Sequence, residues 1–163
     1  MNMERDPWWH GKRGEWYVIA QMVLLALIAI APLAPGQPRW AGQWAFVARG
    51  AGLLLMGVGA VLAGAGVLAL GSNLSPLPHP TDAAALVESG VYGVVRHPIY
   101  AGLVLGSFGW GLLTNSIWAM PLAAGLLVLF EFKARREEAQ LARRFPGYAN
   151  YQRRMRKFIP FIY

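Results

Sequence analysis

Two groups of polar residues in this sequence have side chains that can do chemistry. The first is Arg96-His97-Pro98, which directly precedes an apolar run starting at Ile99. The second is the pair Glu137-Glu138, within a charged stretch. Paired carboxylates can hold a cationic ligand such as an ammonium or sulfonium group, whereas histidine can move a proton and arginine can hold an anion. These residues are therefore candidate site residues.

Each group also has a purely structural interpretation. Proline is favoured in the first turn of a helix, and arginine and histidine can sit at the level of lipid headgroups. Glu137 and Glu138 can belong to a solvated helical face with neighbouring arginines. Glu131 is a further candidate carboxylate, but it precedes Arg135 by four residues, a spacing that allows a local ion pair on a helix.

Glycines follow the first group at helical spacing. Gly106 and Gly109 are typical of close helix–helix packing. Gly102 lies one turn after the expected helix start, where free backbone N–H groups and the helix dipole favour an anionic group. Tyr100 lies between the proline and this glycine and completes the pattern R-H-P-x-Y-x-G.

The composition points to a membrane protein of one domain. The chain has 163 residues, of which 56% are hydrophobic and 14% charged, against about 25% charged residues in soluble domains. The absence of cysteine excludes disulfides, thiolate nucleophiles and cysteine-bound metals. His10 and His79 have no partners at metal-ligand spacing, so no metal site is expected.

Four apolar segments account for most of the chain, at residues 16–33, 44–70, 99–113 and 117–132. A membrane span needs about 20 residues, which the first two segments supply. The last two are shorter, are joined only by residues 114–116, and are expected to form a short helical hairpin. We therefore expect an all-α polytopic membrane protein with about four transmembrane helices and a cytoplasmic, helical C-terminal tail.

Basic residues are distributed unevenly about these segments. With four spans, thirteen of the fifteen lysines and arginines fall on one side, and only Arg39 and Arg49 on the other. The positive-inside rule then places both termini in the cytoplasm. The net charge of +7 is explained by a fringe that faces anionic headgroups, so no nucleic-acid partner is expected. Seven tryptophans near the segment ends are typical of an aromatic belt, at positions 8, 9, 16, 40, 44, 110 and 118.

Two non-apolar regions lie on the expected cytoplasmic side. Residues 71–98 form a loop with a short expected helix at 82–88, and residues 133–163 continue the fourth helix until Pro146-Gly147 breaks it. Tyr148 and Tyr151 in this tail are interpreted either as a lid over a ligand or as interface anchors. Residues 1–163 are treated as a single membrane domain, with two N-terminal spans in 1–70 and the candidate core in 71–163.

Taken in order, these residues resemble the isoprenylcysteine carboxyl methyltransferase and phospholipid methyltransferase superfamily of integral membrane enzymes. The resemblance covers roughly residues 70 to 163. It is carried by Leu86-Val87, Gly90-Val91-Tyr92, Arg96, His97, Pro98, Tyr100, Gly102, Glu137, Glu138, Leu141, Phe145, Tyr148, Tyr151 and Ile159-Pro160.

The resemblance implies an enzyme that binds S-adenosylmethionine without a Rossmann domain, and the sequence indeed lacks a strand followed by a glycine-rich turn. It implies a cofactor pocket lined by Tyr92, His97, Pro98, Tyr100 and Gly102 and closed by Glu137 and Glu138. Tyr148 and Tyr151 are assigned to the substrate side. A G-x-G on the preceding span would match Gly64-Ala65-Gly66 or the similar pair at 57 and 59.

The chemistry expected there is methyl transfer by in-line displacement, for which positioning supplies much of the rate. Arg96 is the candidate to hold a carboxylate acceptor, while an amine or thiol acceptor would need Glu138 or His97 to take a proton. The acceptor is expected to be a lipid or another lipophilic molecule, entering laterally. A bias toward alanine, glycine, leucine and arginine indicates a prokaryote, hence a bacterial inner membrane, where a prenylated protein would be an unusual substrate.

Two other functions remain open at this stage. Some sterol reductases of membranes share an R-H-P-x-Y-x-G-like element and use NADPH, although they are generally much longer. A non-enzymatic scaffold with a basic lipid-binding tail would explain the arginines, tryptophans and glycines, but it would leave the ordered motifs to coincidence.

Overall fold

The computed structural model describes residues 14–74, 86–160, 162 and 163. Four long helices make up most of these residues. They are α1 (Glu15–Ile30), α2 (Gly42–Leu70), α3 (Pro98–Leu113) and α4 (Ala119–Arg144), and a short α5 (Tyr148–Arg154) follows. Three 3-10 helices are η2 (Ala31–Leu33), η3 (Gly71–Asn73) and η4 (Gly90–Gly93). Within these described residues there is no strand beyond one isolated bridge, so the expected all-helical fold is confirmed.

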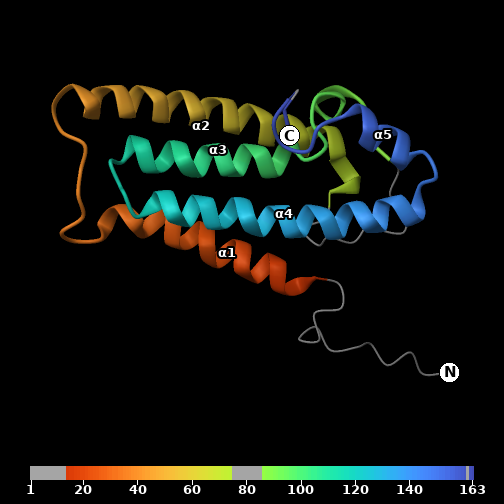
Figure 1. Cartoon of the computed structure of the whole chain (residues 1–163), viewed down its shortest axis with the longest axis horizontal. Helices are drawn as coiled ribbons and strands as arrows, with labels where there is room; N and C mark the ends of the chain where they lie inside the picture. The colour runs from red at the N-terminus through yellow and green to blue at the C-terminus, as the bar shows by residue number, and fades with distance from the viewer. Residues whose placement is uncertain (1–13, 75–85, 161) are drawn as a thin grey trace.

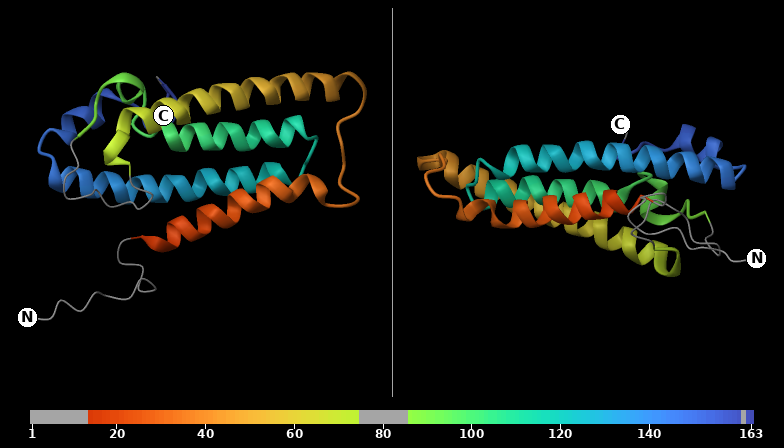
Figure 2. Two further views of the ribbon diagram at one scale, coloured as in Figure 1. Left: turned by 180° about the vertical axis from the view of Figure 1, so that it is seen from behind. Right: turned by 90° about the horizontal axis from the view of Figure 1, so that it is seen from below.

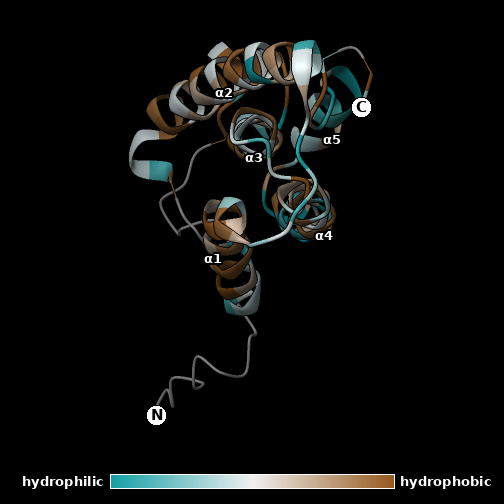
Figure 3. Ribbon diagram, turned by 90° about the vertical axis from the view of Figure 1, so that its left-hand side faces the viewer, coloured by the Kyte–Doolittle hydropathy of each residue, from teal (hydrophilic) through white to brown (hydrophobic). Residues whose placement is uncertain are grey.

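The four long helices lie side by side, and consecutive helices run in opposite directions (Figure 1). Viewed along their length, α3 lies between α2 and α4, and α1 lies beside α4 (Figure 3). The two views of Figure 2 show that the C-terminal segment returns to the end of the bundle where α3 begins. This arrangement brings the start of α3, the last turns of α4 and the tail to one end of the molecule.

Helices α2 and α3 pack backbone to backbone through glycine. A Cβ built on Gly59 would lie 2.5 Å from the carbonyl oxygen of Gly102, and one on Gly52 would lie 2.7 Å from that of Gly109. The packing role expected for Gly109 is therefore confirmed, because only glycine permits this approach. A Cβ on Gly106 would meet nothing within 4 Å, although a Cβ on Gly59 would lie 2.9 Å from the Gly106 nitrogen.

Two helical segments are long and apolar enough to cross a membrane. Residues Glu15–Leu33 and Gly42–Asn73 have mean hydropathies of 2.2 and 2.4 over their best windows, and Pro98–Leu113 is apolar but shorter. Large apolar side chains are exposed along α1 and α2, including Met22, Val23, Phe46, Leu54 and Leu68. Such surfaces suit contact with lipid. That four helices span the bilayer stays a prediction.

Helix α4 joins the fourth apolar segment and the charged tail in one element. It is continuous from Ala119 to Arg144, and α5 starts only at Tyr148, so the expected break at Pro146 is confirmed. The helix expected at 82–88 is wrong at residues 86–88, which are not helical. Residues 82–85 lie outside the described residues. Gly90, with φ of +61°, instead begins a 3-10 turn.

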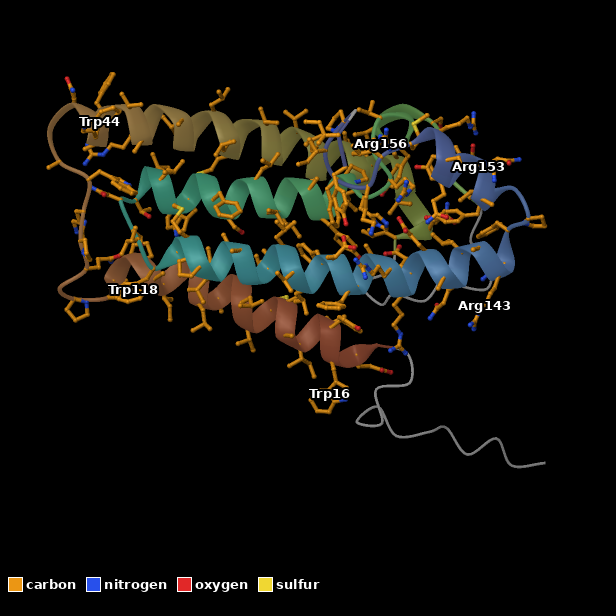
Figure 4. All side chains as sticks on the ribbon, in the orientation of Figure 1. Trp16, Trp44, Trp118, Arg143, Arg153 and Arg156 are labelled. Atoms are coloured by element: carbon orange, nitrogen blue, oxygen red, sulfur yellow. The ribbon has the colours of Figure 1, made fainter. Side chains whose placement is uncertain are left out.

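The two ends of the bundle differ in polarity. Trp44 and Trp118 lie at one end, whereas Arg143, Arg153 and Arg156 gather at the other (Figure 4). Coloured by hydropathy, α1 is largely hydrophobic and α5 hydrophilic (Figure 3). This polarity agrees with the charge grouping inferred from the sequence, and the orientation in a membrane remains a prediction.

A buried amide ties together the two loops at the tryptophan end. Gln37 is 8% exposed. Its Nε2 donates to the carbonyl oxygens of Ala31 and Pro32 at 3.1 Å, within its own loop. Ser116 Oγ of the other loop donates to Gln37 Oε1 at 2.8 Å.

Gln37→Leu is expected to lower the free energy of unfolding by about 2 kcal/mol, because it leaves buried polar groups unpaired. Thermal unfolding in detergent measures this. Gln43→Leu on the exposed start of α2 is the control, and an equal loss in both variants would contradict the assignment.

Candidate active site

The candidate residues of the two motifs converge at the basic end of the bundle. His97 is the N-cap of α3, and Pro98 is the first residue of this helix. The start of α3 therefore fixes the direction in which the backbone of Arg96 and His97 runs into the helix. Glu137 and Glu138 lie on the charged half of α4. The structure thus places side chains separated by about forty residues in direct contact, as the ordered motifs require.

Glu138 is the centre of this cluster. Arg96 Nε donates to Glu138 Oε1 at 2.8 Å, and His97 Nε2 lies 3.0 Å from the same oxygen. Gln152 Nε2 donates to the other oxygen at 3.0 Å. The side chains of Glu138, Arg96 and His97 are only 7%, 9% and 6% exposed. Glu138 is therefore a buried carboxylate whose two oxygens are both satisfied by the protein.

This setting controls the ionisation of Glu138. Burial raises the pKa of the carboxyl group, but the hydrogen bond and charge of His97, followed by those of Arg96, outweigh burial and lower the pKa from 4.5 to about 2. Glu138 consequently stays ionised across the physiological range.

The low pKa of Glu138 predicts a loss of stability in acid. Since the folded value lies below the unfolded one, the contribution of Glu138 is complete above about pH 4.5 and is lost as the pH falls through about 2. The thermal midpoint should therefore fall over this window, and it should fall less steeply in Glu138→Gln. Glu88→Gln, which removes an exposed partner of Arg154, is expected to keep the wild-type profile. Parallel profiles for wild type and Glu138→Gln would contradict the prediction.

Glu137 has a different environment from its neighbour. Its Oε2 accepts a hydrogen bond from the Tyr100 hydroxyl at 3.0 Å and lies 3.8 Å from His97 Nδ1, and its side chain is 30% exposed. One of the two adjacent carboxylates is thus enclosed and the other accessible, a distinction that the E-E motif alone does not reveal.

Aromatic rings extend the site into the bundle. The His97 ring stacks on Tyr100, with 5.3 Å between centroids and 2° between planes, and Tyr100 stacks on Phe130 at 4.5 Å and 11°. Lys133 Nζ lies 5.1 Å from the Tyr100 ring centroid. Phe130 and Lys133 were missed from the sequence. The spacing of four between Lys133 and Glu137, which puts both on one helical face, is the signal that could have found the lysine.

The C-terminal segment forms a wall of the site by backbone pairing. The amide nitrogens of Arg96 and His97 donate to the carbonyl oxygens of Arg156 and Lys157 at 2.8 and 3.0 Å, beside the parallel bridge between Val95 and Arg156. Arg96 Nη1 donates to the carbonyls of Gln152 and Met155. No sequence pattern predicts this pairing, since it depends on how the chain returns after α5.

Arg96 is largely satisfied within the protein. Three of the five N–H donors of its guanidinium bind Glu138 and two carbonyl oxygens. In the structure Arg96 therefore clamps α4 and the tail to the start of α3. Its expected role in holding an acceptor carboxylate stays a prediction.

Tyr148 and Tyr151 of the tail lie inside the molecule, and so does Tyr92 of η4. Tyr92, Tyr148 and Tyr151 are 8%, 1% and 3% exposed, and the Tyr151 hydroxyl donates to the Tyr92 carbonyl at 2.7 Å. The interpretation of Tyr148 and Tyr151 as interface anchors is wrong, because buried rings cannot reach headgroups. Burial and the charge of Glu138 raise the pKa of the Tyr148 hydroxyl, so this group is neutral. Contact of either ring with a substrate stays a prediction.

The glycines assigned to the cofactor pocket are engaged in helix packing. A Cβ on Gly102 would lie 2.4 Å from the Gly59 carbonyl oxygen, and one on Gly66 would lie 3.1 Å from Pro98 Cγ. In both G-x-G pairs the second glycine, Gly59 or Gly66, faces α3, while Gly57 and Gly64 would meet nothing within 4 Å. Gly59, Gly66 and Gly102 thus position α3 against α2, and direct contact of any of these glycines with a cofactor stays a prediction.

Glu131 belongs to a separate group. It pairs with Arg135 at 2.6 Å, as the spacing of four predicts, and also with Lys157 at 2.8 Å. In the part of the chain that the structure describes, no three potential metal ligands lie together. His10 and His79 fall outside that part.

Comparisons with known proteins are consistent with this geometry. The family model described as phospholipid methyltransferase matches residues 47–147. The cobalt-zinc-cadmium resistance protein CzcN of Cupriavidus metallidurans is 34% identical over 149 residues, covering 90% of this chain and 62% of that protein. Protein-S-isoprenylcysteine O-methyltransferase of Rattus norvegicus is 33% identical over 116 residues, covering 69% of this chain and 41% of that protein.

A solved structure shares the fold. The eukaryotic intramembrane Ras methyltransferase ICMT, an isoprenylcysteine carboxyl methyltransferase, aligns over 93% of this chain and 54% of its own, with a TM-score of 0.59 and 27% identity. The present chain spans about 62% of CzcN and smaller shares of these methyltransferases.

Proposed function

Since this chain belongs to the phospholipid methyltransferase family, within the superfamily that includes the isoprenylcysteine methyltransferases, we propose that it transfers a methyl group from S-adenosylmethionine to a lipophilic acceptor at a membrane face. The observation that carries the proposal is the convergence of Arg96 and His97 on Glu138, beside the accessible carboxylate of Glu137. Residues of the R-H-P and E-E motifs thus form one contiguous cluster.

The residues present fit this cofactor. Glu137 offers a partly exposed carboxylate to an ammonium group, and the stacked rings of His97 and Tyr100 lie beside this carboxylate. Glu138 and Arg96 hold these groups in place. When bound, the cofactor supplies a methyl group on a positively charged sulfur.

The protein's contribution is chiefly orientation. Holding donor and acceptor in line is worth roughly 7–11 kcal/mol of the barrier in favourable cases, and the displacement needs no nucleophilic side chain. With a pKa of about 2, Glu138 is a poor general base near neutrality. This favours an acceptor that needs no deprotonation, such as a carboxylate, over an amine or a thiol that must lose a proton.

The position of the site supports a membrane substrate. It lies at the basic end of a bundle whose outer helices expose large apolar side chains. We propose that the apolar segments of the four long helices lie in a bacterial inner membrane, with the charged end of α4 and the tail at the cytoplasmic face. An acceptor with an apolar tail would then reach the site laterally, with its reacting head at the polar end.

Transfer of a labelled methyl group tests the proposal. The purified full chain in nanodiscs is incubated with S-adenosylmethionine labelled in the methyl group and with a bacterial lipid extract or N-acetyl-farnesylcysteine. Label is expected in the organic phase and is expected to be lost in His97→Ala. Release of labelled methanol by alkali identifies a methyl ester, because N-methyl and S-methyl products resist this treatment. Failure of the folded protein to label any acceptor would contradict the proposal.

A further inference from the structure

Glu131 is a carboxylate on α4 that the proposed chemistry leaves without a role. Its Oε1 accepts a hydrogen bond from Lys157 Nζ at 2.8 Å, and the two residues are 26 positions apart in the sequence. Their side chains are only 18% and 11% exposed. Solvent ions screen a partly buried ion pair much less than an exposed one. This pair therefore joins α4 to the segment of chain that follows α5.

The same stretch of the tail contacts His97 at two places. The carbonyl oxygen of Lys157 accepts a hydrogen bond from the His97 amide nitrogen at 3.0 Å. The ring of the next residue, Phe158, lies 5.9 Å from the His97 ring between centroids. Phe158 is 6% exposed and belongs to the hydrophobic core. Lys157 is thus bound to α4 by its side chain and to the start of α3 by its backbone.

The segment that makes these contacts has little regular structure of its own. Residues 155–159, all of which are described, form no helix, and within them only Arg156 takes part in a bridge. Segments of this kind open locally at a lower free energy than packed helices do. The position of residues 155–159 beside His97 therefore depends on contacts with neighbouring elements, among which the pair of Lys157 with Glu131 is ionic.

We propose that Glu131 and Lys157 form a latch that keeps residues 155–159 against the start of α3 and thereby positions His97 for binding of S-adenosylmethionine. The inference rests on the proposed methyl transfer and adds two positioning residues to it. Neither residue needs to touch the cofactor. When only a fraction of the molecules has the tail in place, the apparent dissociation constant of a ligand rises by the inverse of that fraction.

Arg135 provides a matched control, because it pairs with the same carboxylate oxygen. Arg135 Nε donates to Glu131 Oε1 at 2.6 Å, but both residues belong to α4 and the Arg135 side chain is 65% exposed. Arg135→Gln thus removes one cation from Glu131 without releasing the tail, whereas Lys157→Gln removes the other cation and opens the latch. Glu131→Gln removes the carboxylate that both cations share.

Hydrogen exchange and ligand binding of the detergent-purified full chain test the latch. The amides of Arg96 and His97, which pair with the tail, are expected to exchange about tenfold faster in Glu131→Gln and in Lys157→Gln, as for a lost charge-assisted hydrogen bond. S-adenosylhomocysteine should bind about fivefold or more weakly to both variants. Arg135→Gln should match the wild type in both measurements. The charge-swapped double variant, Glu131→Lys with Lys157→Glu, should recover slow exchange and tight binding, because it restores the ion pair.

The outcomes separate the latch from the proposed function. Unchanged exchange at Arg96 and His97 in both single variants, or equal acceleration in Arg135→Gln, overturns the inference. Faster exchange with unchanged S-adenosylhomocysteine affinity also overturns it, because the tail would then not position the site, and so does a double variant that behaves no better than the single ones. Hydrogen exchange needs no ligand, so it tests the latch even if the wild type fails to bind S-adenosylhomocysteine, a result that would count against the proposed function.

Discussion

Glu138→Ala is expected to abolish S-adenosylhomocysteine binding and to lower the free energy of unfolding by about 3–5 kcal/mol. The loss is large because the variant leaves Arg96 and His97 buried without their shared carboxylate. It also frees Gln152, so the tail loses a contact with α4. Calorimetric titration and denaturant or thermal unfolding of the purified variant measure the two effects.

A matched carboxylate controls for this substitution. Glu88 pairs with Arg154 at 2.8 Å, but both side chains are exposed, so Glu88→Ala is expected to cost at most about 1 kcal/mol and to leave S-adenosylhomocysteine binding intact. Comparable stability of the two variants, or unchanged binding in Glu138→Ala, would show that the buried cluster does not organise the site.

Gly59→Ala is expected to destabilise the protein by about 1–3 kcal/mol and to weaken S-adenosylhomocysteine binding. The added Cβ would lie 2.5 Å from the Gly102 carbonyl oxygen and 2.9 Å from the Gly106 nitrogen. Both are backbone atoms that cannot rotate away, so α2 and α3 must separate. Because α3 carries Tyr100 and follows His97 directly, the separation moves site residues.

Gly57→Ala is the matched control for Gly59→Ala. The two glycines lie two residues apart on α2, and a Cβ on Gly57 would meet nothing within 4 Å. Alanine is preferred to glycine within a helix by about 0.5–1 kcal/mol, so this variant should be neutral or slightly more stable. Equal destabilisation by both substitutions would mean that lost glycine flexibility, and not helix contact, explains the effect.

The helices could be predicted because their information is local. Apolar composition and proline positions gave bounds within a few residues of the structure for the first three segments, and the break before Tyr148 follows from Pro146. The fourth segment was predicted to continue into the charged tail, and α4 does so. The helix predicted at 82–88 is wrong at residues 86–88, which are not helical, and the 3-10 turn that begins at Gly90 was not predicted.

The site could be predicted as a set of residues but not as a geometry. Adjacent glutamates look equivalent in the sequence, yet burial and three hydrogen-bond partners distinguish Glu138 from the accessible Glu137. These partners come from the start of α3 and from the tail. Their alignment depends on the return of the chain after α5, and local patterns carry no information about such long-range pairing.

The roles assigned to isolated residues depended equally on long-range contacts. The buried environment of Lys133 is apparent only in the structure, where Gln21 of α1 and the ring of Tyr100 lie beside it. Likewise, Gly102 was expected to face a ligand, whereas its Cα lies against α2. The motif therefore identified residues that lie close together in the fold, and the packing of the helices determines which of these residues face inward.

Calorimetric titration of the purified full chain with S-adenosylhomocysteine tests the central claim most directly, since it needs no knowledge of the acceptor. Saturable binding of one molecule per chain with a micromolar dissociation constant is the predicted result. The absence of binding to a sample shown to be folded by cooperative thermal unfolding would contradict the claim that the cluster around Glu138 serves a methyltransferase.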